Sequence, residues 1–246
     1  MPGGRGWGQD ATLLPGWQKI RKAAVDTICA PETWVPAGAA LVLQVGDMDT
    51  RLSKWAVKKT PVYGSNENAD ETSDKLRNVA RGVYLTSVIL TPSGSDPADW
   101  AFAKAKGFAV EAASVQITRN VTGFLKGSTK RTRPNEANDR SFPSHHASET
   151  ATYSILASQN IEATQLPGML KTPLRIGALG LGAGAAWARV EAERHYPSDV
   201  LAGMAIGHFF GAFISDAFLG LDYEGGAGVT VEPSRDGFKL AIFWSY

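Results

Sequence analysis

The chain has 246 residues, of which 43% are hydrophobic and 20% are charged. This composition supports a full hydrophobic core and excludes a disordered chain. The formal net charge is +1, so any basic surface is local, and we expect no nucleic-acid partner. The single cysteine excludes an internal disulfide framework.

Neither a signal peptide nor a membrane-spanning segment is apparent in the sequence. Residues 1–9 are Gly-rich and polar, and no apolar run reaches the ~18 residues of a spanning helix. The nearest stretches are residues 34–45, which are too few, and residues 201–219, which contain His208 and Asp216. Both are apolar enough to lie at a membrane surface, so the sequence allows peripheral membrane contact.

The order of the elements predicts a mostly helical bundle with a short C-terminal β-hairpin. We expect a flexible tail over residues 1–15, a helical domain over 16–224, and a hairpin over 225–246 that packs on it. A turn-rich loop is expected over 61–73. Pro31 and Pro36 are expected to interrupt helical structure. Helical periodicity predicts helices over residues 16–29, 50–59, 76–91, 96–124, 143–160, 173–194 and 197–219.

Side-chain patterns predict how some of these elements pack. Gly180 and Gly184, four residues apart, are expected to allow close packing of the 173–194 helix. Over residues 238–246 every second residue is large and apolar, which gives one strongly apolar face and is typical of a strand. The spacing of apolar residues predicts the buried face of the 96–124 helix: Val110, Ile117, Val121 and Phe124.

Three polar clusters lie at predicted helix boundaries. The second of them begins with Pro143, and a proline at the first helical position leaves the next amides without intrahelical partners. The amides of Ser144, His145 and His146 would then bind an anion, helped by the helix dipole. His146 adds a group that titrates near neutral pH. The three clusters are Lys126, Lys130, Arg131 and Arg133; residues 143–146; and Arg189, His195 and Asp199.

The third cluster has the pattern of an activated nucleophile. Pro197 starts a helix, so His195 precedes this helix and Asp199 lies in its first turn. A carboxylate there can fix the imidazole tautomer and raise its basicity, and Arg189 can bind an oxyanion. These residue types favour phosphoryl transfer, which needs positioning and positive charge and here needs no metal.

At this point the residues resemble a known family. Lys126, six intervening residues and Arg133 followed by proline resemble the first motif of the type 2 phosphatidic acid phosphatases. That superfamily includes bacterial class A acid phosphatases and vanadium haloperoxidases. Residues 143–146 (PSHH) resemble its Pro-Ser-Gly-His motif, and residues 188–199 resemble its third, Ser-Arg-led motif.

The resemblance implies a helical bundle of the acid phosphatase/haloperoxidase type. It also implies a metal-independent phosphatase that acts on a phosphomonoester or diphosphate, lipid-linked or soluble, through a phosphohistidine. His195 would be the nucleophile, Asp199 would orient it, and His146 would be the general acid and then the base. The phosphate oxygens would be bound by Lys126, Arg133, Ser144, the amide of His145, and Arg189. No cofactor is implied, vanadate would inhibit as a phosphate mimic, and the location would be periplasmic or membrane-associated.

Two positions depart from the family motifs, because His145 replaces a glycine and Ala188 replaces a serine. Adjacent helical positions lie about 100° apart, so His145 and His146 should not both face the phosphate, and the motif register selects His146. Three alternatives stay open. They are a metal site formed by His146, Glu149 and His195; a vanadate-dependent haloperoxidase; and a catalytically lapsed phosphate- or lipid-binding relative. The sequence leaves the substrate and the oligomeric state open.

Overall fold

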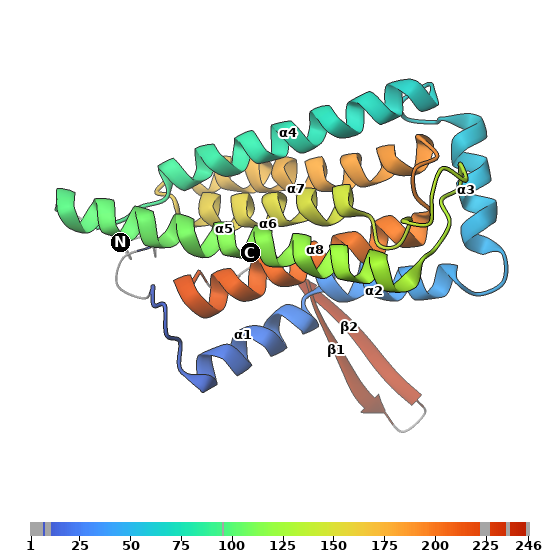
Figure 1. The fold of residues 1–246 in the computed structure, drawn as a ribbon. Helices are drawn as coiled ribbons and strands as arrows, with labels where there is room; N and C mark the ends of the chain where they lie inside the picture. Colours follow the sequence, from blue (N-terminus) through green and yellow to red (C-terminus); the bar gives the residue numbers. More distant parts are fainter. Residues whose placement is uncertain (1–6, 8–10, 95, 222–226, 235–236, 245–246) are drawn as a thin grey trace.

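The computed structural model describes residues 7, 11–94, 96–221, 227–234 and 237–244, the last two ranges as backbone only. Among these residues, eight α-helices are followed by two strands (Figure 1). The strands β1 (Ala227–Ser234) and β2 (Gly237–Trp244) pair antiparallel. The helices are α1 (Trp17–Cys29), α2 (Pro31–Leu43), α3 (Met48–Lys59), α4 (Asn66–Leu90), α5 (Pro97–Thr129), α6 (His145–Ala163), α7 (Gly168–Glu191) and α8 (Pro197–Leu219).

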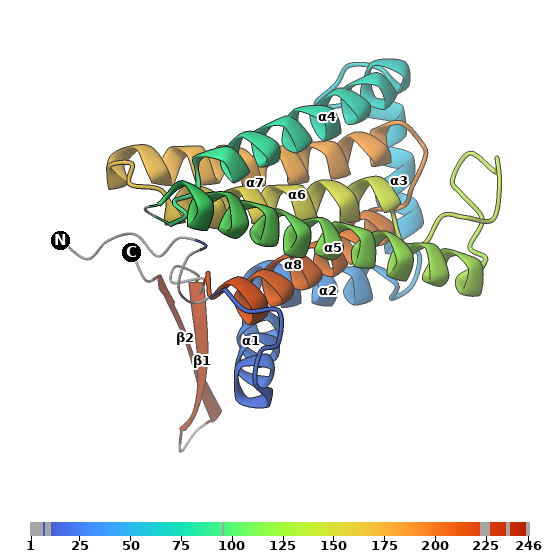
Figure 2. The same ribbon diagram turned by 60° about the vertical axis from the view of Figure 1, so that its left-hand side comes forward.

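Helix α6 lies at the centre of the bundle. It packs against α4, α5, α7 and α8, and nearly all of its residues are buried. One end of the bundle holds the last turns of α5 and α7 and the first turns of α4, α6 and α8 (Figures 1 and 2). Helix α3 lies across that end. The segments that carry the three polar clusters therefore meet there.

Three glycines of α8 allow α6 to approach closely. Gly203, Gly207 and Gly211 recur every four residues, so they share one face of the helix. A Cβ at Gly207 would lie 2.1 Å from the backbone oxygen of Ser148, and one at Gly203 would lie 2.6 Å from that of Ser144. No side chain fits at such distances, so only glycine at these positions allows the backbones of α6 and α8 to pack this closely.

The glycines of α7 only partly behave as predicted. A Cβ at Gly184 would lie 3.2 Å from a methyl carbon of Leu76, so this residue does lie in a close contact. At Gly180 a Cβ would meet nothing within 4 Å. The close approach expected at Gly180 is therefore absent.

The buried face of α5 also differs from the prediction. Val110 is buried and Val121 is partly buried, but Ile117 is 38% exposed and Phe124 is 73% exposed. The bundle thus places many large apolar side chains outside, the inverse of the usual pattern of a soluble helix. The side chains that α5 buries are mostly small or polar: Ala103, Gly107, Val110, Glu111, Ser114, Val115, Thr118, Thr122 and Lys126.

Several helix starts differ from the predictions. Helix α2 begins at Pro31, where a proline loses no hydrogen bond, and continues through Pro36. Helix α4 begins at Asn66 because the Ser65 side chain accepts a hydrogen bond of 3.0 Å from a first-turn amide. Residues 66–73 are therefore helical, and the prediction of a loop there was wrong. Helix α7 begins five residues before Pro173 and contains it.

The prediction of a mostly helical bundle is confirmed for the helices. The start of the chain is not entirely a free tail, because Trp7 is fully buried and its amide donates to the Pro92 carbonyl at 2.9 Å. The division of the chain into tail, helical domain and hairpin stays a prediction. The packing of the hairpin on the bundle also stays a prediction, because the side chains of residues 222–246 lie outside the described ones.

Candidate active site

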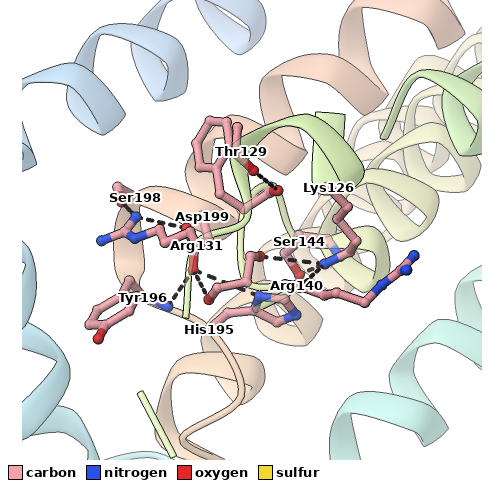
Figure 3. A network of polar contacts seen from close by, with 12 residues as sticks. Lys126, Thr129, Arg131, Arg140, Ser144, His195, Tyr196, Ser198 and Asp199 are labelled. Atoms are coloured by element: carbon pink, nitrogen blue, oxygen red, sulfur yellow. Dashed lines mark hydrogen bonds and ion pairs between the residues drawn. The ribbon is translucent and has the colours of Figure 1, made fainter. Parts of the chain in front are cut away.

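The structure brings the predicted site residues together at one end of the bundle. Figure 3 shows Lys126, Ser144, His195 and Asp199 among them. Each comes from a helix end or from the loop between α5 and α6, so segments far apart in the sequence supply one site. These residues are Lys126 at the end of α5, Arg133 in the following loop, Ser144, His145 and His146 at the start of α6, Arg189 at the end of α7, and His195 and Asp199 at the start of α8.

The start of α6 lies two residues later than predicted, at His145, and Ser144 is its N-cap. The Ser144 hydroxyl accepts from the Ala147 amide at 3.4 Å, and the Ser144 amide donates to the Asp199 carbonyl at 2.9 Å. The expectation that the Ser144 amide is unpartnered was therefore wrong. The amides of His145 and His146 have no acceptor among the described residues, so these two can face an anion.

His195 is deeply buried and faces Asp199. Its Nδ1 lies 3.8 Å from Oδ2 of Asp199 and has no closer hydrogen-bond partner among the described residues. Burial lowers the pKa of His195 to about 4, aided by the charges of Lys126 and Arg189 and opposed by Asp199. The imidazole is therefore neutral at neutral pH. Because Nδ1 faces the carboxylate, Nε2 is the nitrogen available for attack.

Both carboxylate oxygens of Asp199 are engaged. Oδ2 accepts from the Ser141 hydroxyl and from the Tyr196 amide at 2.9 Å, and Oδ1 accepts from Nη1 of Arg131 at 2.8 Å. Burial acts to raise the pKa of Asp199, but the nearby His195 imidazole, the charge of Arg131 and the hydrogen bond from Ser141 outweigh it, so the pKa is lowered. Asp199 is therefore an ionised partner for the imidazole.

His146 and His145 face different surroundings. Nε2 of His146 lies 2.7 Å from Oδ1 of Asp74 on α4. Burial and then the charge of Arg189 lower the pKa of His146 to about 4, and Asp74 opposes this. Burial also lowers the pKa of His145, and the charge of Glu149 opposes this shift. The two imidazoles thus point apart, as the helix geometry requires.

The cationic side chains form a cradle with unused donors. Nη1 of Arg189 donates to Asp70 at 2.6 Å and to Ser73 at 3.0 Å. The Nε atoms of Arg189 and Arg133 are buried without a hydrogen-bond partner among the described residues. Burial, with the charge of Arg133, lowers the pKa of Lys126 to about 8. Buried donors without acceptors are rare in proteins, so this cradle is suited to an anion.

A comparison with known protein families matches the region that holds these residues. A sequence profile of the PAP2 superfamily matches residues 107–220, which include every predicted site residue from Lys126 to Asp199. The region over residues 107–220 belongs to the PAP2 superfamily. The family resemblance of the three motifs is thereby confirmed.

One solved structure shows that the helical fold is shared. It is described as the crystal structure of the first transmembrane PAP2 type phosphatidylglycerolphosphate phosphatase from Bacillus subtilis. The TM-score is 0.55 at 18% sequence identity, and the match covers 78% of this chain and 94% of that chain. At this identity the likeness shows the fold alone. A comparison with curated protein sequences finds no match.

The metal site considered for this PAP2 protein does not form. The Glu149 carboxylate accepts from Nε of Arg119 at 3.0 Å and from the Tyr153 hydroxyl at 2.9 Å. His146 faces Asp74 instead. The described residues hold no group of three or more His, Cys, Asp or Glu side chains that could bind a metal ion.

An apolar cavity of about 650 Å³ lies next to the site, between α2 and α8. Leu41, Phe142 and Ile206 line it together with several alanines. Arg131 also lines it, so one side chain borders both the cavity and Asp199. An apolar part of a ligand would fit in this cavity.

Sequence reasoning missed several polar residues of this PAP2 site. Asp70 and Asp74 contact Arg189 and His146, but Asp70 lies in the predicted loop over 61–73 and Asp74 lies just after it, before the predicted helix. Their spacing of four residues would have placed them on one helix face, had the Ser65 cap been recognised. The other missed residues are Asp49, Ser141 and Ser73, whereas Arg131 was placed in the first polar cluster but given no role.

Proposed function

We propose that this PAP2 protein is a metal-independent phosphatase that hydrolyses a phosphomonoester or diphosphate through a phosphohistidine. The observation that carries the proposal is the combination of a neutral, buried imidazole at His195 with the unpartnered buried donors of Arg133 and Arg189. A phosphoryl group would satisfy those donors while its phosphorus faces the imidazole. The positive charge required for phosphoryl transfer then comes from side chains.

In the first step, Nε2 of His195 attacks phosphorus and the bond from phosphorus to the leaving oxygen breaks. His146 donates a proton to that oxygen, so the product leaves as an alcohol or, from a diphosphate, as a phosphate. Lys126, Arg133 and Arg189 neutralise the equatorial oxygens. Asp199 stabilises the positive charge that develops on the His195 ring.

In the second step, His146 accepts a proton from water and the water oxygen attacks the phosphohistidine. The phosphorus–nitrogen bond breaks, inorganic phosphate leaves, and His195 returns to its neutral form. The pKa of His146 is about 4, too low for an efficient acid at neutral pH. A bound phosphate brings negative charge next to His146, which raises the pKa of its imidazole.

We infer that the substrate is lipid-linked and that the protein works at a membrane surface. Large apolar side chains are exposed on α2 and α5, among them Leu41 and Phe124, each 73% exposed. Exposed apolar patches of this kind mark interaction surfaces. Among the described helices, α8 has the length and composition of a membrane span, but 61% of its most apolar window is buried in the bundle.

Phosphate release from a panel of substrates tests this function. The panel runs from a small aryl phosphate to phosphatidate and a prenyl diphosphate, with wild type and His195→Ala in parallel. We expect release from the lipid members that disappears in the variant. Release from the aryl phosphate alone would contradict the lipid-linked class. Release that survives in His195→Ala within tenfold would contradict the mechanism.

If no substrate releases phosphate, two alternatives remain: a vanadate-dependent haloperoxidase and a catalytically lapsed binding protein. A bromide–peroxide assay with added vanadate then separates them, because vanadate mimics the phosphoryl transition state in the same cradle. Bromide oxidation would indicate a haloperoxidase. Its absence, together with measurable binding of inorganic phosphate, would indicate a lapsed binding protein.

A further inference from the structure

A second buried carboxylate, that of Asp49, lies near the proposed catalytic pair His195 and Asp199. Asp49, in the first turn of α3, is 4% exposed although it is remote in sequence from the three motifs. Its Oδ1 accepts from the Ser198 amide at 2.9 Å, and its Oδ2 accepts from the Ser198 hydroxyl. Helix α3 is thereby attached to the first turn of α8, one residue before Asp199.

Arg131 bridges the two carboxylates. Its Nη2 donates to Oδ2 of Asp49 at 2.7 Å, and its Nη1 donates to Oδ1 of Asp199 at 2.8 Å. The guanidinium also lies over the Tyr196 ring, 4.2 Å from its centroid. Figure 3 shows Arg131 on one side of Asp199 and His195 on the other. Arg131 is one of the six residues that the Lys126–Arg133 motif leaves unspecified.

This bridge fixes the orientation of the Asp199 carboxylate. Its Oδ1 is held by Arg131, so Oδ2 is the oxygen that remains directed at Nδ1 of His195. A planar guanidinium is suited to this task, because its donors have a fixed geometry. Loss of the bond to Oδ1 would leave the carboxylate held only at Oδ2, by Ser141 and Tyr196, so that it could turn about that oxygen.

The bridge also sets the local charge. Two carboxylates and one guanidinium carry one net negative charge, so Asp49 offsets the positive charge of Arg131. That balance matters because Lys126 of α5 and Arg189 of α7 both act on His195 as cations. Without Asp49, the charge of Arg131 would cancel much of the influence of Asp199 on the imidazole.

We propose that Asp49 and Arg131 are positioning residues for the nucleophile: Arg131 fixes the Asp199 carboxylate, and Asp49 offsets the charge of Arg131. Asp199 then keeps the proton of His195 on Nδ1 and leaves the lone pair on Nε2. This inference rests on the proposed function for its catalytic meaning. Its geometric content concerns the tautomer of His195, which is measurable without turnover.

Nitrogen-15 NMR of the histidines in the 246-residue chain tests the inference. The His195 signals are assigned by their loss in His195→Asn. We expect wild type at neutral pH to hold the proton on Nδ1, and both Arg131→Gln and Asp49→Asn to shift the ring toward a mixture of tautomers. Arg131→Lys, which keeps one donor and the charge, should restore most of the wild-type signal.

Kinetics add a readout that a purely structural role would not give. We expect Arg131→Gln and Asp49→Asn to lower kcat roughly tenfold to a hundredfold, with KM nearly unchanged. The acid limb of kcat/KM should move to higher pH in Arg131→Gln, because a cation is lost near His195. It should move to lower pH in Asp49→Asn, because an anion is lost.

Asp47→Asn is the matched control. Asp47 is exposed, lies two residues from Asp49, and makes no side-chain bond at the start of α3. An unchanged His195 tautomer in both test variants, or rates equal to those of Asp47→Asn, would overturn the proposal. If Asp49→Asn does not fold, the tautomer of His195 in Arg131→Gln and in Arg131→Lys tests the proposal. If wild type releases no phosphate, the proposed phosphatase function fails. The tautomer of His195 still tests the positioning role of Asp49 and Arg131, so the two proposals are tested separately.

Discussion

The backbone amide of Ser144 donates a hydrogen bond to the backbone carbonyl of Asp199, with 2.9 Å between nitrogen and oxygen. This bond joins the N-cap of α6 to the first turn of α8. The general acid proposed here follows Ser144 by two residues, and the proposed nucleophile precedes Asp199 by four. The relative position of the two imidazoles therefore depends on how closely α6 and α8 approach each other.

Gly207→Ala should destabilise the protein and impair activity together. Its Cβ would lie 2.1 Å from the Ser148 oxygen, so α6 and α8 must move apart. We expect a loss of roughly 1–3 kcal/mol in the free energy of unfolding. Gly180→Ala is the control, because this helical glycine has free space around it. It should raise stability by about 0.5–1 kcal/mol. Thermal or denaturant unfolding measures both, and equal effects would contradict the role of the α8 glycines.

The wild-type enzyme should work best at acid pH. His195 must be neutral, so kcat/KM falls as the pH drops below its pKa of about 4. His146 must be protonated, so kcat/KM also falls as the pH rises above its pKa of about 4 in the free enzyme. The alkaline limb of kcat should lie at higher pH, because bound phosphate raises the pKa of His146. A value of kcat/KM that keeps rising to pH 8 would contradict these assignments.

Asp74→Asn should move the alkaline limb of kcat/KM to lower pH. The Asp74 carboxylate lies 2.7 Å from Nε2 of His146 and raises the pKa of that imidazole, so its loss lowers this pKa. Glu71→Gln is the control, because it removes one charge from an exposed position on the same helix. If the pH profiles of kcat/KM for the two variants coincide, the contact between Asp74 and His146 has no role in proton transfer.

The sequence predicted the helix starts that carry strong local signals. Pro197 and Asp199 mark the beginning of α8, and the structure places it there. The start of α4 was missed because its first turns are rich in Asn, Asp and Glu, a composition that is also typical of loops. In this chain those acidic residues include Asp70 and Asp74, which contact Arg189 and His146.

Other features could not be predicted from local patterns. The apolar spacing of α5 identified Ile117 and Phe124, yet these face outward, because the interior is filled by small and polar side chains. Hydrophobic periodicity assumes that water surrounds the bundle, and it fails where the outer face is apolar. The role of Arg131 needed the tertiary fold, because its partners Asp49 and Asp199 lie on two remote helices.

His145→Gly should change substrate preference more than phosphate affinity. The half-buried imidazole lies at the start of α6, where the family motif has glycine, so its removal opens space beside the cradle. We expect the ratio of kcat/KM for a bulky over a small ester to rise roughly tenfold. Inhibition by inorganic phosphate should stay within about twofold. Equal rate changes across small and bulky esters would argue against a narrowing role for His145.

Orthovanadate should inhibit the enzyme, whereas EDTA should leave its activity unchanged. Vanadate takes a geometry close to that of a phosphoryl group in transfer, and Lys126, Arg133 and Arg189 would bind its oxygens. Because these side chains supply the positive charge, no metal is needed for the step. Activity that is lost on chelation and restored by zinc would show that the mechanism is wrong.

Trapping of the covalent intermediate is the most direct test of the central claim. Wild type is mixed with the best substrate, quenched in base, where a phosphohistidine survives, and digested for mass spectrometry. The account predicts phosphate on the peptide that contains His195, and none in His195→Ala. Active enzyme with no phosphorylated peptide, or with phosphate on another side chain, would contradict the account.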